Sequence, residues 1–169
     1  MSQGSRYKPT FRRHREGVTD YRKRKKLLKS RKIRAVIRRS LNHITVQFVQ
    51  YKEDGDVVLV SAISSDLKRY GWKLPKDTTT AAYLTGLLAG KRAQEVGVKE
   101  CIADIGRYTP CKGSRVFAAI KGIIDAGVEC PCDESMFPDE KRLAGEHLTH
   151  KPSVPVEQVK EQILEGKTR

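Results

Sequence analysis

Positive charge in this sequence is confined to its N-terminal end. Residues 1–39 hold 16 Lys and Arg against two acidic residues, whereas residues 40–169 hold 18 of each sign, so the first segment carries the whole net charge of +14. Residues 1–18 show no apolar period and are expected to form an extended arm that its partner orders. The neutral remainder needs no basic segment for solubility, so the arm is expected to bind a polyanion.

A chain of 169 residues of which 38% are apolar can bury one core of ordinary size. We divide it into a basic arm with a short helix (1–32), an α/β domain (33–132) and a C-terminal extension with a late helix (133–169). Thr19 or Asp20 is expected to cap the short helix, Tyr21 to Ser30, whose almost wholly basic surface needs a partner outside the chain. The late helix is expected from Val156 to Leu164.

Apolar residues recur at every second position in the region 33–62, which predicts three strands. Their apolar positions are Ile33, Ala35 and Ile37, then Ile44, Val46 and Phe48, then the run Val57 to Ala62. Asp54-Gly55, between the second and third strands, is typical of a tight reversal. We therefore expect an antiparallel meander.

Two helices with apolar spacing follow the meander. The first runs from Ala81 to Gly97 after a capping cluster of threonines at 78–80, and the second from about Ser114 to Gly127. Extended segments follow them, Val98 to Ile105 and a short piece at Val128. Strand–helix–strand units require parallel pairing and right-handed crossovers. The sequence thus predicts an α/β fold with a mixed five-stranded sheet: three antiparallel strands, then two strands reached through helices.

Aromatic side chains stand at intervals among the cations of the arm, and this mixture favours RNA over duplex DNA as the polyanion. Lys and Arg bind phosphates, while Tyr or Phe at intervals can stack on unpaired bases. The basic run continues into the first strand. The candidate RNA-binding residues are Arg6, Tyr7, Lys8, Arg12, Arg13, Arg15, Tyr21, Arg22, Arg24, Lys25, Arg31, Lys32, Arg34, Arg38 and Arg39.

Two further segments each have two interpretations. Lys112, Ser114 and Arg115 open a predicted helix, where free backbone N–H groups and the helix dipole suit a phosphate, but Ser114 can equally be a plain N-cap. The segment 64–72 places hydroxyls, cations and two aromatics just after a strand. It can contact RNA or protein, or Tyr70 and Trp72 can cover the edge of a core.

Several sequence blocks, in the same order, resemble one known family. They are Arg6-Tyr7-Lys8, Ser64-Ser65-Asp66-Leu67, Tyr70-Gly71-Trp72, residues 82–90 (AYLTGLLAG), Asp104-Ile105-Gly106 and residues 113–118 (GSRVFA), with Phe137-Pro138 and Gly145-Glu146-His147 after them. Over about residues 5–150 the chain resembles the archaeal and eukaryotic form of universal large-subunit ribosomal protein eighteen.

This resemblance implies a structural ribosomal protein that binds 5S rRNA through its basic N-terminal part. It implies that the protein helps attach 5S rRNA to 23S rRNA beside neighbouring large-subunit ribosomal proteins, in the cytoplasm. It also implies an α/β sheet of ribonuclease H-like topology. The length favours the archaeal form, because eukaryotic relatives carry much longer C-terminal extensions.

The alternative function is an RNA-processing or nuclease-like enzyme of ribonuclease H-like fold. That chemistry needs several carboxylates around two divalent cations. The first strand carries no acidic residue, and Asp104 stands alone among the sheet positions, with Asp125 on the next helix. We therefore expect no enzymatic activity, no catalytic residue, no cofactor and no small-molecule substrate.

Cysteine and histidine offer one possible metal site. Cys130 and Cys132, followed by His147 and His150, make four potential zinc ligands. Only Pro131 separates the two cysteines, whereas structural zinc sites usually have two residues or more between paired cysteines. We expect free thiols and no metal.

A membrane surface is the other anionic partner that a basic arm can meet. Leu27 and Leu28 are the only strongly apolar residues between Tyr21 and Arg31, and no Trp or Phe accompanies them. The longest nearly apolar stretch, residues 81–90, is too short to span a bilayer, and the N-terminus lacks the apolar core of a signal peptide. The sequence predicts a soluble intracellular protein with no membrane partner.

Overall fold

Three antiparallel strands form the meander that the alternating pattern predicts. The computed structural model describes residues 4, 6–148 and 155–166. The strands are β1 (Arg34–Arg39), β2 (Ile44–Gln50) and β3 (Val57–Ile63). Ala35 lies opposite Phe48 in the register of β1 and β2, and Ile37 lies opposite Val46. All four side chains are buried on one face of the sheet, as the alternation requires.

The prediction of a fifth strand is wrong. β4 (Ile102–Asp104) pairs in parallel with β1 and completes a mixed sheet of four strands, in the order β3-β2-β1-β4. Beside Val128, where the fifth strand was expected, there is only a single bridge between Glu129 and Glu100. Pro131 follows this bridge, and because proline has no N–H to donate, the ladder does not continue. The α/β class and the mixed sheet are confirmed.

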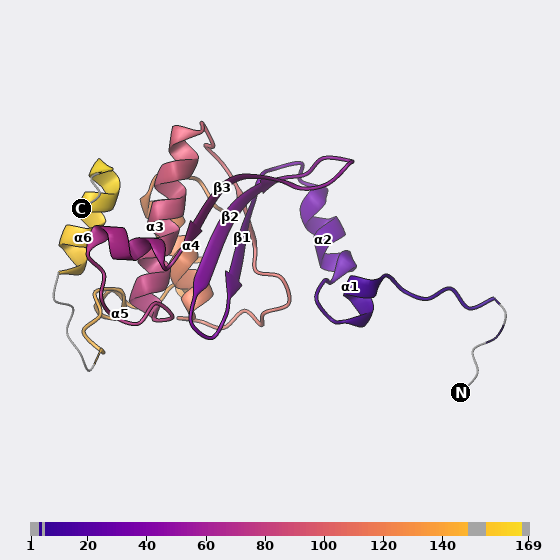
Figure 1. Ribbon diagram of the computed structural model, residues 1–169, viewed down its shortest axis with the longest axis horizontal. Helices are drawn as coiled ribbons and strands as arrows, with labels where there is room; N and C mark the ends of the chain where they lie inside the picture. The colour runs from indigo at the N-terminus through magenta and orange to yellow at the C-terminus, as the bar shows by residue number, and fades with distance from the viewer. Residues whose placement is uncertain (1–3, 5, 149–154, 167–169) are drawn as a thin grey trace.

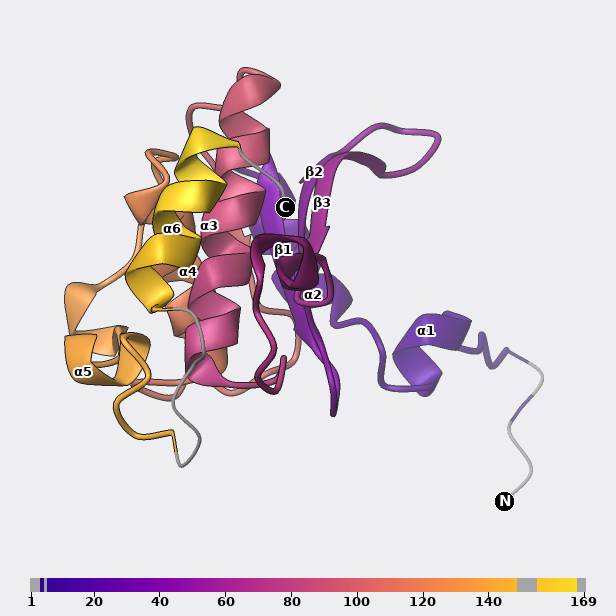
Figure 2. The same ribbon diagram turned by 60° about the vertical axis from the view of Figure 1, so that its left-hand side comes forward.

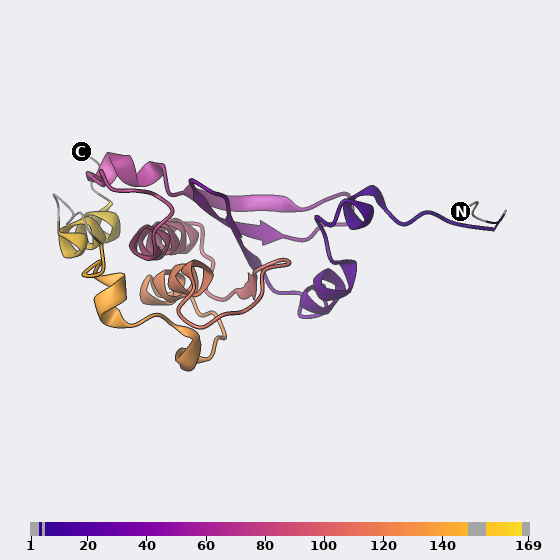
Figure 3. The same cartoon turned by 90° about the horizontal axis from the view of Figure 1, so that it is seen from below.

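Two helices lie side by side against one face of the sheet (Figure 3). They are α3 (Thr79–Glu95) and α4 (Arg115–Asp125), close to the predicted ranges. Thr78 caps α3, because its hydroxyl accepts a hydrogen bond from the N–H of Ala81 at 3.2 Å. α3 packs against the sheet, α4 and the C-terminal helix, so it is buried on nearly all sides.

Gly86 of α3 and Gly122 of α4 let the two helices approach closely. A Cβ atom on Gly122 would overlap the carbonyl oxygen of Tyr83, and one on Gly86 would overlap that of Ala119.

Gly122→Ala should therefore lower the free energy of unfolding by about 1–3 kcal/mol, although the same change inside an open helix raises it by about 0.5–1 kcal/mol. Urea unfolding measures the sign. A variant at least as stable as the parent would contradict the close approach.

Two helices of the C-terminal extension, α5 (Glu140–Leu143) and α6 (Val156–Glu165), pack against α3 (Figure 2). Helix α6 confirms the predicted late helix and buries Val159 and Ile163. Three short elements that no pattern predicted are η1 (Asp66–Tyr70), η2 (Glu134–Met136) and α5 (Glu140–Leu143). Tyr70 and Trp72 are buried, so these two aromatics cover the core. Within the described ranges, no helix is long and apolar enough to cross a membrane.

The basic arm contains two short helices, which lie at the side of the domain (Figure 1). They are α1 (Arg12–Arg15) and α2 (Tyr21–Leu28). Asp20 caps α2 as predicted, since its carboxylate accepts hydrogen bonds from the N–H groups of Arg22 at 2.9 Å and Lys23 at 3.1 Å. The expectation of a wholly extended arm is wrong for α1. This single turn ends at Arg15, and Gly17, with a φ of +69°, redirects the chain shortly after it. So short a helix shows no periodic pattern in the sequence.

Candidate nucleic-acid interface

A groove of about 870 Å³ lies between α2 and the sheet face that α3 and α4 leave open. Val36 and Gln47 of the sheet form one wall, Leu27 and Lys23 of α2 form another, and the loop after β4 adds Arg107. The lining contains seven Lys and Arg against three Asp. The groove is therefore positively charged and suits a polyanion.

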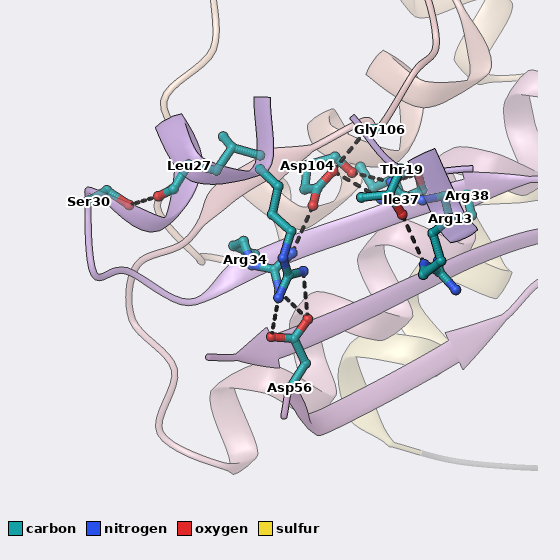
Figure 4. Close-up of polar contacts among 11 residues, drawn as sticks. Arg13, Thr19, Leu27, Ser30, Arg34, Ile37, Arg38, Asp56, Asp104 and Gly106 are labelled. Carbon is teal, nitrogen blue, oxygen red and sulfur yellow. Dashed lines mark hydrogen bonds and ion pairs between the residues drawn. The ribbon is translucent and has the colours of Figure 1, made fainter. Parts of the chain in front are cut away.

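Arg34 of β1 is buried in the wall of this groove, with only 2% of its surface exposed. Its guanidinium donates hydrogen bonds to Asp56 at 2.6 Å and to Asp104 at 2.9 Å (Figure 4). A buried arginine between two carboxylates is shielded from a phosphate outside. Arg34 therefore joins the β2–β3 loop to β4, and its role in RNA binding stays a prediction.

Asp56 fixes α2 to the sheet. Arg24 of α2 donates two hydrogen bonds to the Asp56 carboxylate, both at 2.8 Å. The hydrogen bond from Arg24 holds the pKa of Asp56 below its usual range; partial burial opposes this shift and Arg34 adds to it. Because bidentate arginine–carboxylate pairs have a specific geometry, this pair sets the direction of the basic helix.

Asp104, the carboxylate on which a nuclease would depend, has arginine partners. Burial raises its pKa. The charge and hydrogen bond of Arg38 act in the opposite direction, and together with hydrogen bonds from Gly106 and Arg34 they lower the pKa of Asp104 overall. Arg38 donates to the carboxylate at 3.0 Å, and the N–H of Gly106 donates at 2.9 Å. Asp104 is therefore an ionised structural partner of arginines.

The metal ligands considered in the sequence do not form a site in the described part of the chain. Cys130 is buried and Cys132 is half-buried, both as free thiols. His150 lies outside the described residues. Among the residues that are described, no group of three or more His, Cys, Asp or Glu is placed to hold a metal ion.

Two arginines fasten the turn between α1 and α2. The Nε of Arg13 donates to the hydroxyl of Thr19 at 3.0 Å, and Arg107 donates to the carbonyl of Gly17 at 2.5 Å. Arg107 comes from the loop after β4, so the turn is held beside the groove. Sequence reasoning missed Arg107, because nothing in the sequence indicates a contact between positions 90 residues apart.

The predicted RNA-binding residues differ in exposure. The exposed ones are Arg6, Tyr7, Lys8, Arg12, Arg13, Arg15, Arg22, Lys25, Arg31, Lys32, Arg38, Arg39 and Lys112. The half-buried ones are Tyr21, Arg24, Ser114 and Arg115. Of all these, the structure brings Arg13, Arg24 and Arg38 together around the groove with buried Arg34. Lys23 and Lys26, which were not singled out, also line it.

The start of α4 does not line the groove. Arg115 donates hydrogen bonds to Asp77, at 2.6 Å to its carbonyl and 3.2 Å to its carboxylate, so it is partly engaged within the domain. Ser114 occupies the N-cap position, but its side chain makes no capping hydrogen bond. Phosphate contact by Lys112, Ser114 and Arg115 stays a prediction.

An α/β domain with a cation-lined groove and an exposed basic arm is typical of a nucleic-acid-binding protein. Residues 5–100 match the family described as ribosomal large subunit proteins 60S L5 and 50S L18. Among similar proteins is the large ribosomal subunit protein uL18 of Korarchaeum cryptofilum, 51% identical over 88% of this chain and 76% of the relative. The proteins of the same name from Methanobrevibacter smithii and Methanothermobacter thermautotrophicus are 49% and 48% identical, over 89% and 88% of this chain and 78% and 77% of theirs.

The chain therefore belongs to this family of large-subunit ribosomal proteins, in its archaeal form. It is a structural constituent of the large ribosomal subunit, and its place is in the ribosome, in the cytoplasm. The resemblance found in the sequence blocks is confirmed. Because ribosomal proteins of this family are structural, the family also favours RNA binding over the nuclease-like alternative.

Proposed function

We propose that the chain binds 5S rRNA and helps attach it to 23S rRNA, in contact with neighbouring large-subunit proteins. The observation that supports this most directly is the cation-lined groove beside a basic arm. The groove lies next to α2, whose exposed Arg22 and Lys25 add positive charge beside it. Phosphate contacts from the arm and groove would fix the protein on folded RNA, as Lys and Arg do in other complexes.

Within this proposal, the exposed cations of residues 6–32, with Arg38 and Arg39, contact RNA directly. Arg24 and Arg34 act through Asp56 and Asp104, because their guanidinium groups are bound to these carboxylates and their side chains are only 29% and 3% exposed. Arg38 also binds Asp104, but its side chain is 43% exposed and can still meet a phosphate. Residues 1–32 then form the binding arm, residues 33–132 the domain that positions it, and residues 133–169 an extension.

We also infer a ribonuclease H-like topology, supported by the strand order β3-β2-β1-β4 with only β4 parallel. The same chain is proposed to have no nuclease activity. Ribonuclease H-like catalysis needs carboxylates free to bind divalent cations. Here Asp56 and Asp104 each contact two arginines.

Filter binding at physiological salt tests the function. The protein should bind 5S rRNA about 10³-fold more tightly than a duplex RNA of equal length, the low end of the range for specific protein–DNA complexes. Bound RNA should keep its length when magnesium is added. Equal affinity for both RNAs would contradict the proposal, and shortening of the RNA would favour the nuclease.

A further inference from the structure

A second cavity, of about 750 Å³, lies at the turn between α1 and α2. Thr19, Asp20 and Arg107 line both this cavity and the groove described above. The two spaces are therefore contiguous on the surface. A single strand laid along the groove would therefore reach this cavity over one continuous surface.

An aromatic pair forms part of the cavity lining. The rings of Phe11 and Tyr21 lie with their centroids 5.3 Å apart and their planes at 49°. Phe11 is 73% exposed, whereas Tyr21 is half-buried. Tyr21 therefore packs against one side of the Phe11 ring and leaves the rest of that ring open to solvent. Because the two rings already touch, a base has no room between them and would stack on the open face of Phe11.

The other groups around the cavity suit a phosphate-bearing ligand. Lys8, Arg22 and Arg107 line it, and their charges outnumber the single carboxylate of Asp20. That carboxylate already accepts hydrogen bonds from the N–H groups at the start of α2. A flat apolar surface flanked by cations matches a nucleotide, whose base stacks while its phosphate pairs with Lys or Arg.

We propose that this cavity binds one unpaired nucleotide of the bound RNA, with its base stacked on Phe11 and its phosphates beside Lys8, Arg22 and Arg107. This assignment rests on the proposed function and adds to it a place where the RNA is not double-stranded. Phe11 carries no charge, so it contributes through the base alone. RNA affinity at this point therefore depends on the base as well as on phosphate charge.

The base dependence is tested with two single-stranded RNA hexamers, one normal and one whose six nucleotides lack bases. Both offer the same phosphates. The intact protein should bind the normal hexamer about 5- to 150-fold more tightly, the range for one stacked base. A 2-aminopurine placed in the normal hexamer should lose fluorescence on binding. Equal affinity for the two hexamers would overturn the proposal.

Substitutions at Phe11 test the position. Phe11→Ala and Phe11→Leu should both reduce the preference for the normal hexamer, because neither side chain has a ring, although Leu preserves the apolar bulk. Phe11→Trp should keep the preference, because its ring can still stack on a base. The slope of log affinity against log salt should stay unchanged, since no phosphate contact is lost. Leu41→Ala, at a 90% exposed apolar residue on the β1–β2 turn, is the matched control and should change nothing. A Leu variant that behaves like the parent would contradict stacking.

Two further measurements separate the possible failures. Binding of 5S rRNA by the intact chain tests the proposed function alone. If 5S rRNA is bound while the hexamers bind equally, only the nucleotide cavity is wrong. Adenosine monophosphate at micromolar concentration should not displace the hexamer, because one phosphate cannot replace six. Displacement would assign the cavity to a free nucleotide and overturn its assignment to RNA.

Discussion

A protein that lacks residues 1–30 should remain folded but bind rRNA weakly. The deletion removes α1 and α2, which contain no buried residue, and leaves every strand of the sheet in place. Asp56 loses Arg24 but keeps Arg34, so its carboxylate stays paired. Circular dichroism should therefore show the same strands and the larger helices, α3 and α4.

The expected loss of affinity comes from charge. The deletion removes 11 of the 34 Lys and Arg. If about 6–10 basic side chains contact phosphates in the intact protein, its affinity should fall by about 10³–10⁵ between roughly 50 and 200 mM salt through release of counterions. The truncated protein should show a much flatter salt dependence. Titration of 5S rRNA across this range measures both slopes.

The outcome that would contradict this prediction is a folded truncated protein with the full affinity and the steep slope. In that case the groove residues that remain, such as Arg38 and Arg107, would be the main binding surface. An unfolded truncated protein would show instead that the contact of Arg24 with Asp56 supports the domain. The circular dichroism spectrum distinguishes these two results.

Most of the fold could be predicted because its signals are local. Alternating apolar residues gave the three antiparallel strands, and apolar spacing with Thr78 as a cap gave α3. The sequence alone could not exclude the fifth strand, because a strand forms only where a neighbouring strand pairs with it, and pairing between distant segments is not visible in the local sequence. Val128 has the apolar character of a strand residue, but only one bridge forms beside it before Pro131.

The sequence predicted which part of the chain is basic, but it could not predict how the basic side chains are arranged in space. The count of Lys and Arg identified the arm, yet Arg34 and Arg38 look alike in the sequence, four residues apart on one strand. Arg34 is buried because Asp56 and Asp104, which are distant in the sequence, converge on it. Phe11 was missed for the same reason, since only the turn at Gly17 brings it against Tyr21.

Replacing Arg34 should destabilise the protein far more than replacing Arg38. Both lie on β1 and contact Asp104, and each substitution by Ala removes one positive charge. Arg34→Ala removes the buried guanidinium that bridges Asp56 and Asp104 and leaves the buried Asp104 carboxylate with Arg38 as its one remaining arginine partner. Because breaking a buried ion pair is strongly destabilising, the change should cost about 3–5 kcal/mol in the free energy of unfolding. The side chain of Arg38 is 43% exposed, so Arg38→Ala should cost no more than about 1 kcal/mol.

The two variants should also differ in RNA binding. Arg38→Ala should reduce the salt slope by about one phosphate contact, whereas folded Arg34→Ala should keep the slope, because Arg34 is shielded from phosphate. Urea unfolding and titration of 5S rRNA measure both effects. Adding Asp104→Asn to Arg34→Ala should restore part of the stability, since the amide removes a buried charge that has lost one of its two arginine partners. If Arg34→Ala is as stable as Arg38→Ala and lowers the slope equally, Arg34 contacts RNA directly and the internal role assigned to it is wrong.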